Sequence, residues 1–208
     1  MNNQKKQSVC CFTGNRPKKF PWDYYDKSHV CQTAYLNELT DQILSLISEG
    51  FNYFICGGAI GADMDFAEIV LCCKSVFDIQ LEIAVPCPNQ DDYWQERDKI
   101  RYQNILKKAD VVKMISPVYS HFCMQKRNRY MADKSDVLLS ASNSLHAGGA
   151  ANTRKYCASK HKRNEHIELL FFAEHPESLL GDIADHIEFG LKEQAKKTKA
   201  IQKLKKPR

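Results

Sequence analysis

Short apolar runs alternate along this chain with longer stretches in which apolar residues recur at helical spacing. Apolar runs bounded by Gly, Pro or polar residues are typical of buried strands. They predict strands at residues 9–13, 51–56, 81–85, 111–115, 137–140 and 167–172. The stretches between them predict helices at residues 32–49, 64–74, 92–108, 124–132, 148–160 and 176–199. In the first of these helices Leu36, Leu39 and Ile43 lie three or four positions apart, and Gly50 ends it.

Strand and helix alternate about six times, and this order predicts the fold class. Parallel strands joined by helical crossovers form a sheet with helices on both faces. The predicted strands are nearly continuous in apolar residues, as expected when both faces of a sheet are buried. We therefore expect an α/β fold of three layers with a mostly parallel sheet of about six strands. No repeat or linker divides the sequence, so we expect one domain over residues 1–193 and a tail over residues 194–208.

The distribution of charge changes how the composition is interpreted. The 208 residues carry a net charge of +5, but six Lys and one Arg lie between Gln194 and Arg208 without an acidic residue. Outside this tail 23 basic residues stand against 25 acidic ones, so the body of the chain is close to neutral. A basic tail can hold a nucleic-acid backbone through its phosphates, or it can be the solvated end of the last helix.

The sequence carries no signal for a membrane or for export. Its longest apolar runs, such as residues 169–173, are far below the roughly 18–20 residues that a membrane span needs. The N-terminal residues lead directly into the first strand, without the apolar segment of a signal peptide. We therefore expect a cytoplasmic protein with no membrane partner.

Nine cysteines are many for this length, and the number is odd. Without an export signal, a disulfide framework is not expected. Two adjacent pairs, Cys10 with Cys11 and Cys72 with Cys73, lack the spacing of zinc ligands. Because Cys10, Cys56 and Cys72 lie in apolar runs, we expect free cysteines buried as small hydrophobes. The histidines are scattered as well, so we expect neither a metal site nor a bound cofactor.

The loops that follow the predicted strands carry the candidate chemistry, because ligands of open parallel sheets bind outside the carboxyl ends of the strands. The loop after the second strand is rich in glycine and reads Gly57-Gly58-Ala59-Ile60-Gly61-Ala62-Asp63. Glycine permits a left-handed backbone and close approach of a ligand, and the N-terminus of the following helix offers N–H groups to a phosphate. The spacing matches neither the NAD fingerprint nor a P-loop. The alternative is a tight turn without a ligand.

Asp63 lies near the start of the following helix, where Asp is a common cap. The alternative is a carboxylate that holds ribose hydroxyls or acts as a base at a glycosidic carbon. Gly148 and Gly149 repeat the pattern before another helix, with Thr153 expected in its first turn. We interpret them as a second helix end that can face a phosphate.

Arginines near these loops are candidates for binding phosphate. Arg16 follows the first strand and can bind a phosphate bidentately, or form a surface ion pair. Neighbours on a helix diverge, so we expect one of Arg127 and Arg129 to face the site and the other to face solvent. Asn128 between them can contact a ribose or a base.

Taken together, these motifs resemble the YspA/YpsA-type family of the SLOG superfamily, which comprises Rossmann-like nucleotide-binding proteins. The loop Thr13-Gly14-Asn15-Arg16-Pro17 is similar to the family's Thr-Gly-His-Arg-Pro start, with Asn15 in place of the His. The glycine loop after the second strand also resembles that of the DNA-processing protein DprA. The matches run in order from about Val9 to Phe172, and the later ones are Arg127-Asn128, Met131, Asp133-Lys134-Ser135-Asp136 and Gly148-Gly149-Ala150-Ala151-Asn152-Thr153.

The resemblance implies a single Rossmann-like domain with a site for a nucleotide or nucleotide derivative. ADP-ribose-like ligands are proposed for this branch of the superfamily. The related LOG enzymes cleave the N-glycosidic bond of nucleoside monophosphates and carry the signature Pro-Gly-Gly-x-Gly-Thr followed by a Glu. Here Cys56 and Ala62 stand where that signature has Pro and Thr, so this chain departs from it.

Three functions stay open, and whether a bond is cleaved is undecided. The first is binding or sensing of a nucleotide or nucleotide derivative. The second is a nucleotide N-glycosidase in which Asp63 or Asp133 stabilises the developing positive charge or activates water. The third is DprA-like binding of single-stranded DNA with help from the basic tail. Rossmann-like proteins often pair through helices, so by analogy a homo-oligomer stays open, and the sequence does not reveal the oligomeric state. The candidate ligand-binding residues are Thr13, Gly14, Asn15, Arg16, Gly57, Gly58, Ala59, Gly61, Ala62, Asp63, Arg127, Asn128, Gly148, Gly149 and Thr153.

Overall fold

Strands and helices alternate in the computed structural model, which describes residues 7–143 and 148–176. The strands are β1 (Val9–Gly14), β2 (Tyr53–Cys56), β3 (Gln80–Val85), β4 (Val111–Met114), β5 (Val137–Ser142) and β6 (Arg163–Glu168). The helices are α1 (Val30–Ser48), α2 (Ala62–Cys73), α3 (Glu96–Lys108), α4 (Cys123–Lys134), α5 (Gly149–Ser159) and α6 (Leu169–Glu174), with a 3₁₀ turn η1 (Pro17–Lys19). The predicted α/β class is confirmed.

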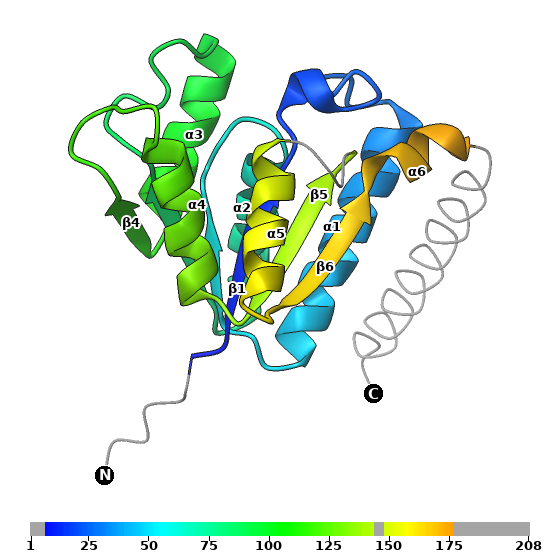
Figure 1. The fold of residues 1–208 in the computed structure, drawn as a ribbon. Coiled ribbons are helices and arrows are strands. Elements are labelled where there is room, and N and C mark those ends of the chain that lie inside the picture. Colours follow the sequence, from blue (N-terminus) through cyan, green and yellow to red (C-terminus); the bar gives the residue numbers. More distant parts are fainter. Residues whose placement is uncertain (1–6, 144–147, 177–208) are drawn as a thin grey trace, which may run out of the picture.

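The strands form one parallel sheet in the order β4-β3-β2-β1-β5-β6 (Figure 1). From β1 the chain adds strands outward to β4 and then returns to place β5 on the other side of β1. Thr13 pairs with Ser140 and Gly14 with Ala141, so β1 and β5 end at the same level. The strand order reverses between these two strands, and such a reversal opens a crevice at their carboxyl ends.

Helices cover both faces of the sheet, as predicted. Figure 1 shows α4 and α5 in front of the sheet and α1 and α2 behind it. The helices α1, α2 and α3 pack against one another in sequence, and α4 packs against α5. Side chains of β1 alternate between the two layers, because Cys10 and Phe12 lie in the core beneath α1 and α2 while Val9 and Cys11 lie in the core beneath α4 and α5. The result is a Rossmann-like arrangement.

The predicted strand at residues 167–172 is wrong for most of its length. The strand β6 ends at Glu168, and residues 169–172 belong to α6. Leu169 and Phe172 are buried while Phe171 between them is 51% exposed, which is the spacing of a helix. The carboxylate of Glu168 accepts a hydrogen bond from the N–H of Leu170 and so caps the helix. The strand itself lies upstream in a polar segment, because β6 is an edge strand.

Burial of the strands and cysteines also differs in part from the prediction. All nine cysteines are free, and Cys10 and Cys56 are buried, but Cys72 is exposed. It lies at the second-last position of α2 and is not among the buried residues of that helix. The strand β4 is exposed along its length because it forms the other edge of the sheet.

The expected final helix, the boundary at residue 193 and the basic tail lie outside the described residues. None of the described helices is long and apolar enough to cross a membrane.

Candidate functional site

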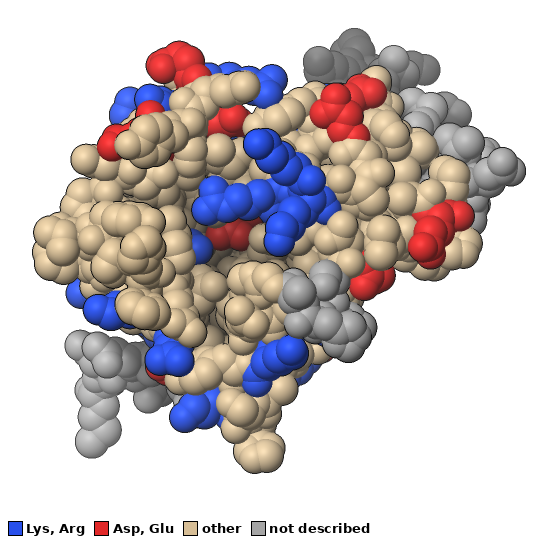
Figure 2. All heavy atoms as spheres, turned by 45° about the horizontal axis from the view of Figure 1, so that its top comes forward, with Lys and Arg blue, Asp and Glu red and all other residues tan. Residues whose placement is uncertain are grey.

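A cleft of about 220 Å³ lies at the carboxyl ends of β1 and β5, where the strand order reverses. Figure 2 looks onto this edge of the sheet and shows Lys and Arg side chains around a hollow in which an acidic side chain is visible. Loops after β1 and β2 and the first turns of α4 and α5 contribute to the wall. The lining residues are Thr13, Gly14, Asn15, Arg16, Lys19, Ala59, Asp63, Met124, Arg127, Asn128, Ser142, Gly148, Gly149 and Ala150.

Glycine is required at two positions of the turn between β2 and α2. A Cβ on Gly57 would collide with the guanidinium of Arg127. Gly61 has a φ of +101°, and a Cβ there would come within 2.5 Å of the carbonyl oxygen of Asn15. The turn therefore passes close to both the loop after β1 and the Arg127 side chain. Neither glycine lines the cleft; both lie behind its wall and allow the close packing there.

Arg127 brings a buried positive charge into the cleft from α4. Its residue surface is only 6% exposed. The Nη1 atom lies 3.8 Å from Oδ2 of Asp63, which is beyond hydrogen-bond distance. Among the described residues, Nε and Nη1 have no hydrogen-bond partner although both atoms are buried. Burial lowers the pKa of Arg127, and the carboxylate of Asp63 opposes that effect.

Asp63 supplies the carboxylate that faces this guanidinium. The predicted role as a helix cap is wrong, because Gly61 is the N-cap of α2 and Asp63 lies in its first turn. Its Oδ1 accepts a hydrogen bond of 3.2 Å from the backbone N–H of Gly14, and this bond ties α2 to the end of β1. Burial raises the pKa of Asp63, while Arg127 and Arg16 act in the opposite direction.

The charges that line the cleft favour an anion. Arg16, Lys19 and Arg127 contribute three positive charges, and Asp63 carries the one carboxylate among the described lining residues. Lys19 lies across the opening, with its Nζ 3.2 Å from the place where a Cβ on Gly148 would be. The excess of two positive charges matches a phosphate or pyrophosphate group.

The start of α5 adds partial positive charge to the same cleft. Gly148 is the N-cap, has a φ of +103° and makes no side-chain cap because it has no side chain. Gly148, Gly149 and Ala150 line the cleft at the point where the helix dipole is positive. Backbone N–H groups at such a position can bind phosphate oxygens.

Most of the candidate ligand-binding residues lie together in this cleft. Gly57, Gly58, Gly61 and Ala62 are the exceptions that form the turn behind it. Thr153 is a further exception, because its hydroxyl donates to the carbonyl of Gly149 (2.9 Å) and its side chain lines a groove between α4 and α5.

The second catalytic candidate lies outside the cleft. Asp133 is exposed on α4, and its Oδ1 accepts a hydrogen bond of 2.7 Å from the hydroxyl of Tyr156. It lines no part of the cleft. The two arginines of α4 diverge as predicted, since Arg127 points into the cleft and Arg129 is exposed along the groove between α4 and α5. Of the two carboxylates named from the sequence, Asp63 alone is placed to meet a ligand in the cleft.

Asn15 connects the loops that follow β1 and β5. Its Nδ2 donates to the carbonyl of Lys19 (2.9 Å) and to Oδ1 of Asn143 (2.7 Å). Nδ2 of Asn143 in turn donates to the same carbonyl of Lys19 (2.7 Å). The side chain of Asn15 therefore holds η1 against the end of β5. Lys19 is not among the residues predicted from the sequence. Its position three residues after Arg16, at the end of the 3₁₀ turn η1, could have indicated that both side chains lie near the same cleft.

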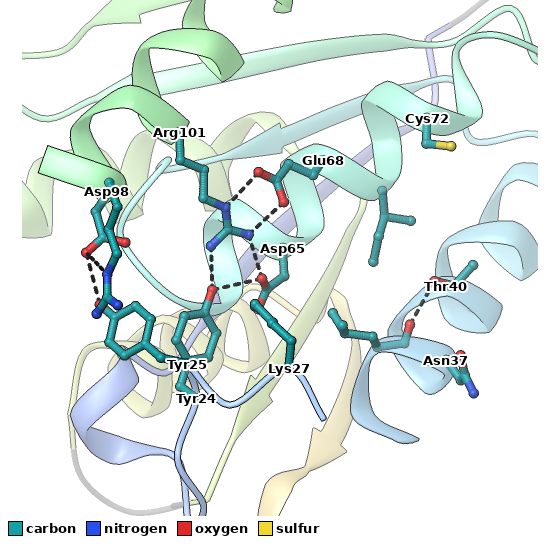
Figure 3. A pocket seen from close by; sticks show the side chains of 13 residues that line it. Tyr24, Tyr25, Lys27, Asn37, Thr40, Asp65, Glu68, Cys72, Asp98 and Arg101 are labelled. Carbon is teal, nitrogen blue, oxygen red and sulfur yellow. Dashed lines mark hydrogen bonds and ion pairs between the residues drawn. The ribbon is translucent and has the colours of Figure 1, made fainter. Parts of the chain in front are cut away.

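A second network braces the site from the α2 side. Figure 3 shows Arg101 of α3 pointing at Asp65, Glu68 and the hydroxyl of Tyr24. Arg101 donates to Asp65 (2.6 Å) and, through two nitrogens, to Glu68 (2.7 Å each). The Tyr24 hydroxyl lies 2.8 Å from Oδ1 of Asp65 and 3.3 Å from the carbonyl oxygen of Gly61. Because these charged groups pair with one another, we interpret the network as support for the glycine turn.

Comparison with known proteins identifies the family of this chain. Residues 10–174 match the model of the YspA SLOG family, and this range includes every residue that lines the cleft. A UPF0398 protein of Halalkalibacterium halodurans is 37% identical over 118 residues, which cover 55% of this chain and 62% of that protein, less than two thirds of its length. A UPF0398 protein of Bacillus cereus (strain B4264) is 25% identical over 163 residues, which cover 77% of this chain and 85% of that protein.

A solved structure is similar in fold. It is the X-ray structure of DNA processing protein A (DprA) from Streptococcus pneumoniae, with a TM-score of 0.51 and 12% sequence identity. The similarity covers 77% of this chain and 50% of that chain. At this identity the likeness concerns the fold alone.

Proposed function

This chain belongs to the YspA SLOG family, and from that premise we propose that its cleft binds a phosphate-bearing nucleotide or nucleotide derivative, such as an ADP-ribose-like molecule. The observation that carries the proposal is the buried guanidinium of Arg127 with unpartnered Nε and Nη1 atoms. A buried donor without an acceptor costs roughly 1–3 kcal/mol, more when it is charged. Arg127 lines the cleft, so a phosphate there would lie beside its guanidinium.

The surroundings of Arg127 support an anionic ligand over a neutral one. Arg16 and Lys19 lie on one side of the cleft and the N-terminus of α5 on the other. Arginine binds phosphate through parallel hydrogen bonds, and these are stronger than bonds between neutral groups. Asp63 holds the guanidinium by charge while leaving its donors available. We infer that the phosphate groups lie between Arg127 and the first turn of α5.

A nucleotide N-glycosidase is the second candidate, and Asp63 is the observation that favours it. A buried carboxylate with a raised pKa inside a phosphate-binding cleft is a candidate general acid or base. It would stabilise positive charge at the anomeric carbon or activate water. Release of free base from a nucleotide separates this function from binding alone.

The first experiment is a thermal-shift and calorimetric titration with AMP, ADP and ADP-ribose, with products followed by chromatography. At about 100 times its dissociation constant a ligand stabilises the fold by about 2.7 kcal/mol. We expect Arg127→Met to weaken binding at least tenfold. Lys126→Met, which removes a charge from an exposed position of the same helix, is the matched control and is expected to bind normally.

Each result decides between the functions. A shift without turnover supports a binding or sensing protein, whereas a shift with release of base supports the glycosidase. Equal affinity of wild type and Arg127→Met would exclude the site proposed here. Absence of any shift would direct attention to single-stranded DNA, whose binding would then have to depend on the basic tail at residues 194–208.

A further inference from the structure

A groove of about 510 Å³ between α4 and α5 continues from the cleft. Met124, Asn128 and Gly149 line both cavities, so the two are adjacent. The junction is open at Gly149, where a Cβ would have no neighbour closer than Nδ2 of Asn128 at 4.0 Å. Binding sites for small molecules have volumes of roughly 300–1,000 Å³, and the cleft reaches that range only together with this groove.

Like the cleft, the groove is lined by cations, here Arg129 and Lys155, and by amides, but it adds an aromatic ring. Three side-chain amides line it, Gln125 and Asn128 from α4 and Asn152 from α5. Tyr156 lies one turn beyond Asn152 on the same face of α5 and adds an aromatic ring. No described side chain that lines the groove is acidic. Amides form paired hydrogen bonds with the edges of bases, and aromatic rings stack on base faces.

An unused acceptor lies at the junction of the two cavities. The Oδ1 atom of Asn128 is buried and has no hydrogen-bond partner among the described residues. Asn128 follows Arg127 directly in α4 and lines both cavities, whereas Arg127 lines the cleft alone. A ligand that spans both cavities would place its anionic group at Arg127 and its other end in the groove beyond Asn128.

We infer that the groove between α4 and α5 is a nucleobase subsite. The phosphates of the ligand lie in the cleft at Arg127, the ribose lies at the junction beside Gly149, and the base lies between α4 and α5 among the three amides. This inference rests on the proposed function and extends it. It places the base on the α5 side of the sheet and away from the turn at Gly57–Asp63.

The test compares ADP with inorganic pyrophosphate, which carries the phosphates without the base. Asn152→Trp fills the groove from an exposed position on α5 and does not line the cleft. Asn104→Trp makes the same change at an exposed position of α3 and is the matched control. By isothermal titration calorimetry we expect wild type to bind ADP at least tenfold more tightly than pyrophosphate. We expect Asn152→Trp to lose that difference while its affinity for pyrophosphate is unchanged, and Asn104→Trp to keep it.

The outcomes separate this inference from the proposed function. If pyrophosphate and ADP bind wild type equally and Asn152→Trp changes neither, the subsite is excluded and the phosphate site stands. If ADP binds more tightly and Asn152→Trp has no effect on it, the base lies elsewhere and the inference is overturned. If neither compound binds wild type, the proposed function fails and the subsite fails with it.

Discussion

The Nη1 atom of Arg127 and the Oδ2 atom of Asp63 face each other across 3.8 Å in a buried site without a hydrogen bond between them. The carboxylate is held by the backbone N–H of Gly14 instead. Its charge therefore keeps the guanidinium ionised in a desolvated place while the guanidinium donors stay free. This separation distinguishes the pair from a closed, hydrogen-bonded salt bridge and is the feature on which the proposed anion site depends.

The first prediction concerns the charge of Asp63. Asp63→Asn retains an oxygen that can accept from Gly14 and removes a negative charge from the cleft. We expect the affinity for pyrophosphate to rise about tenfold, or about 1.4 kcal/mol. Calorimetric titration measures it, with the exposed Asp92→Asn as control. A lower affinity in Asp63→Asn would show that the carboxylate itself contacts the ligand, and loss of a base-releasing activity would identify it as catalytic.

A second prediction tests the packing of the glycine turn. In Gly57→Ala the new methyl group would occupy the place of the Arg127 guanidinium. We expect a loss of unfolding free energy of roughly 1–3 kcal/mol, as is typical of overpacking, together with weaker phosphate binding. Urea denaturation gives the stability. Gly149→Ala is the matched control, because a Cβ there meets nothing closer than 4.0 Å, and it should unfold within about 0.5 kcal/mol of wild type.

The third prediction concerns the network that braces the turn. Arg101→Met leaves the buried carboxylate of Asp65 without its cation, which typically costs about 3–5 kcal/mol. Burial already raises the pKa of Asp65 and Arg101 opposes this, so the variant should raise it further. The loss of unfolding free energy in Arg101→Met relative to wild type should therefore become smaller as the pH falls and Asp65 becomes protonated.

Denaturation of wild type and Arg101→Met at several pH values measures this change. Arg163→Met breaks two ion pairs, with Glu49 and Glu165, but the arginine side chain is 46% exposed and each pair should cost about 0–1 kcal/mol. If Arg101→Met lost as little unfolding free energy as Arg163→Met, or if its loss grew on acidification, the assigned role of the network would be contradicted.

A fourth prediction is a loss of stability in acid that depends on Glu82. This side chain is fully buried on β3 and accepts hydrogen bonds from Lys134 (2.6 Å), Tyr130 (2.6 Å) and Tyr53 (2.5 Å). Burial alone would raise its pKa, but these bonds outweigh burial and hold the pKa below its ordinary value of 4.5. The stability that Glu82 contributes is therefore present above about pH 4.5 and lost as the pH falls through the lowered value.

Glu82→Gln should be less stable than wild type at neutral pH by roughly 1.5–3 kcal/mol, the usual worth of hydrogen bonds to a charged group. The difference in unfolding free energy between Glu82→Gln and wild type should become smaller below pH 4.5, and denaturant unfolding measures it. The exposed Glu96→Gln provides the comparison. A difference between Glu82→Gln and wild type that stays constant down to pH 3 would show that the carboxylate keeps its ordinary titration.

Much of the architecture follows from local pattern, and the exceptions have identifiable causes. Five of the predicted strands lie where the structure has them within a few residues, because apolar runs and glycine turns are local signals. The run at residues 169–172 belongs to a helix, because Glu168 caps it and the sheet is completed by a polar edge strand upstream. Thr153 lies in the groove and not in the cleft, because the face of a helix that meets a ligand depends on where its first residue lies.

The sequence by itself determined the alternation of strand and helix, the parallel sheet and the loops in which the candidate residues lie, since each depends on residues close together in the chain. Only the tertiary structure decided that Arg127 lies beside Asp63, that Asp133 lies away from the cleft and that Lys19 lies opposite Gly148. These relationships join segments from distant parts of the chain. They depend on β5 inserting beside β1, and no local pattern of residues specifies that order of strands.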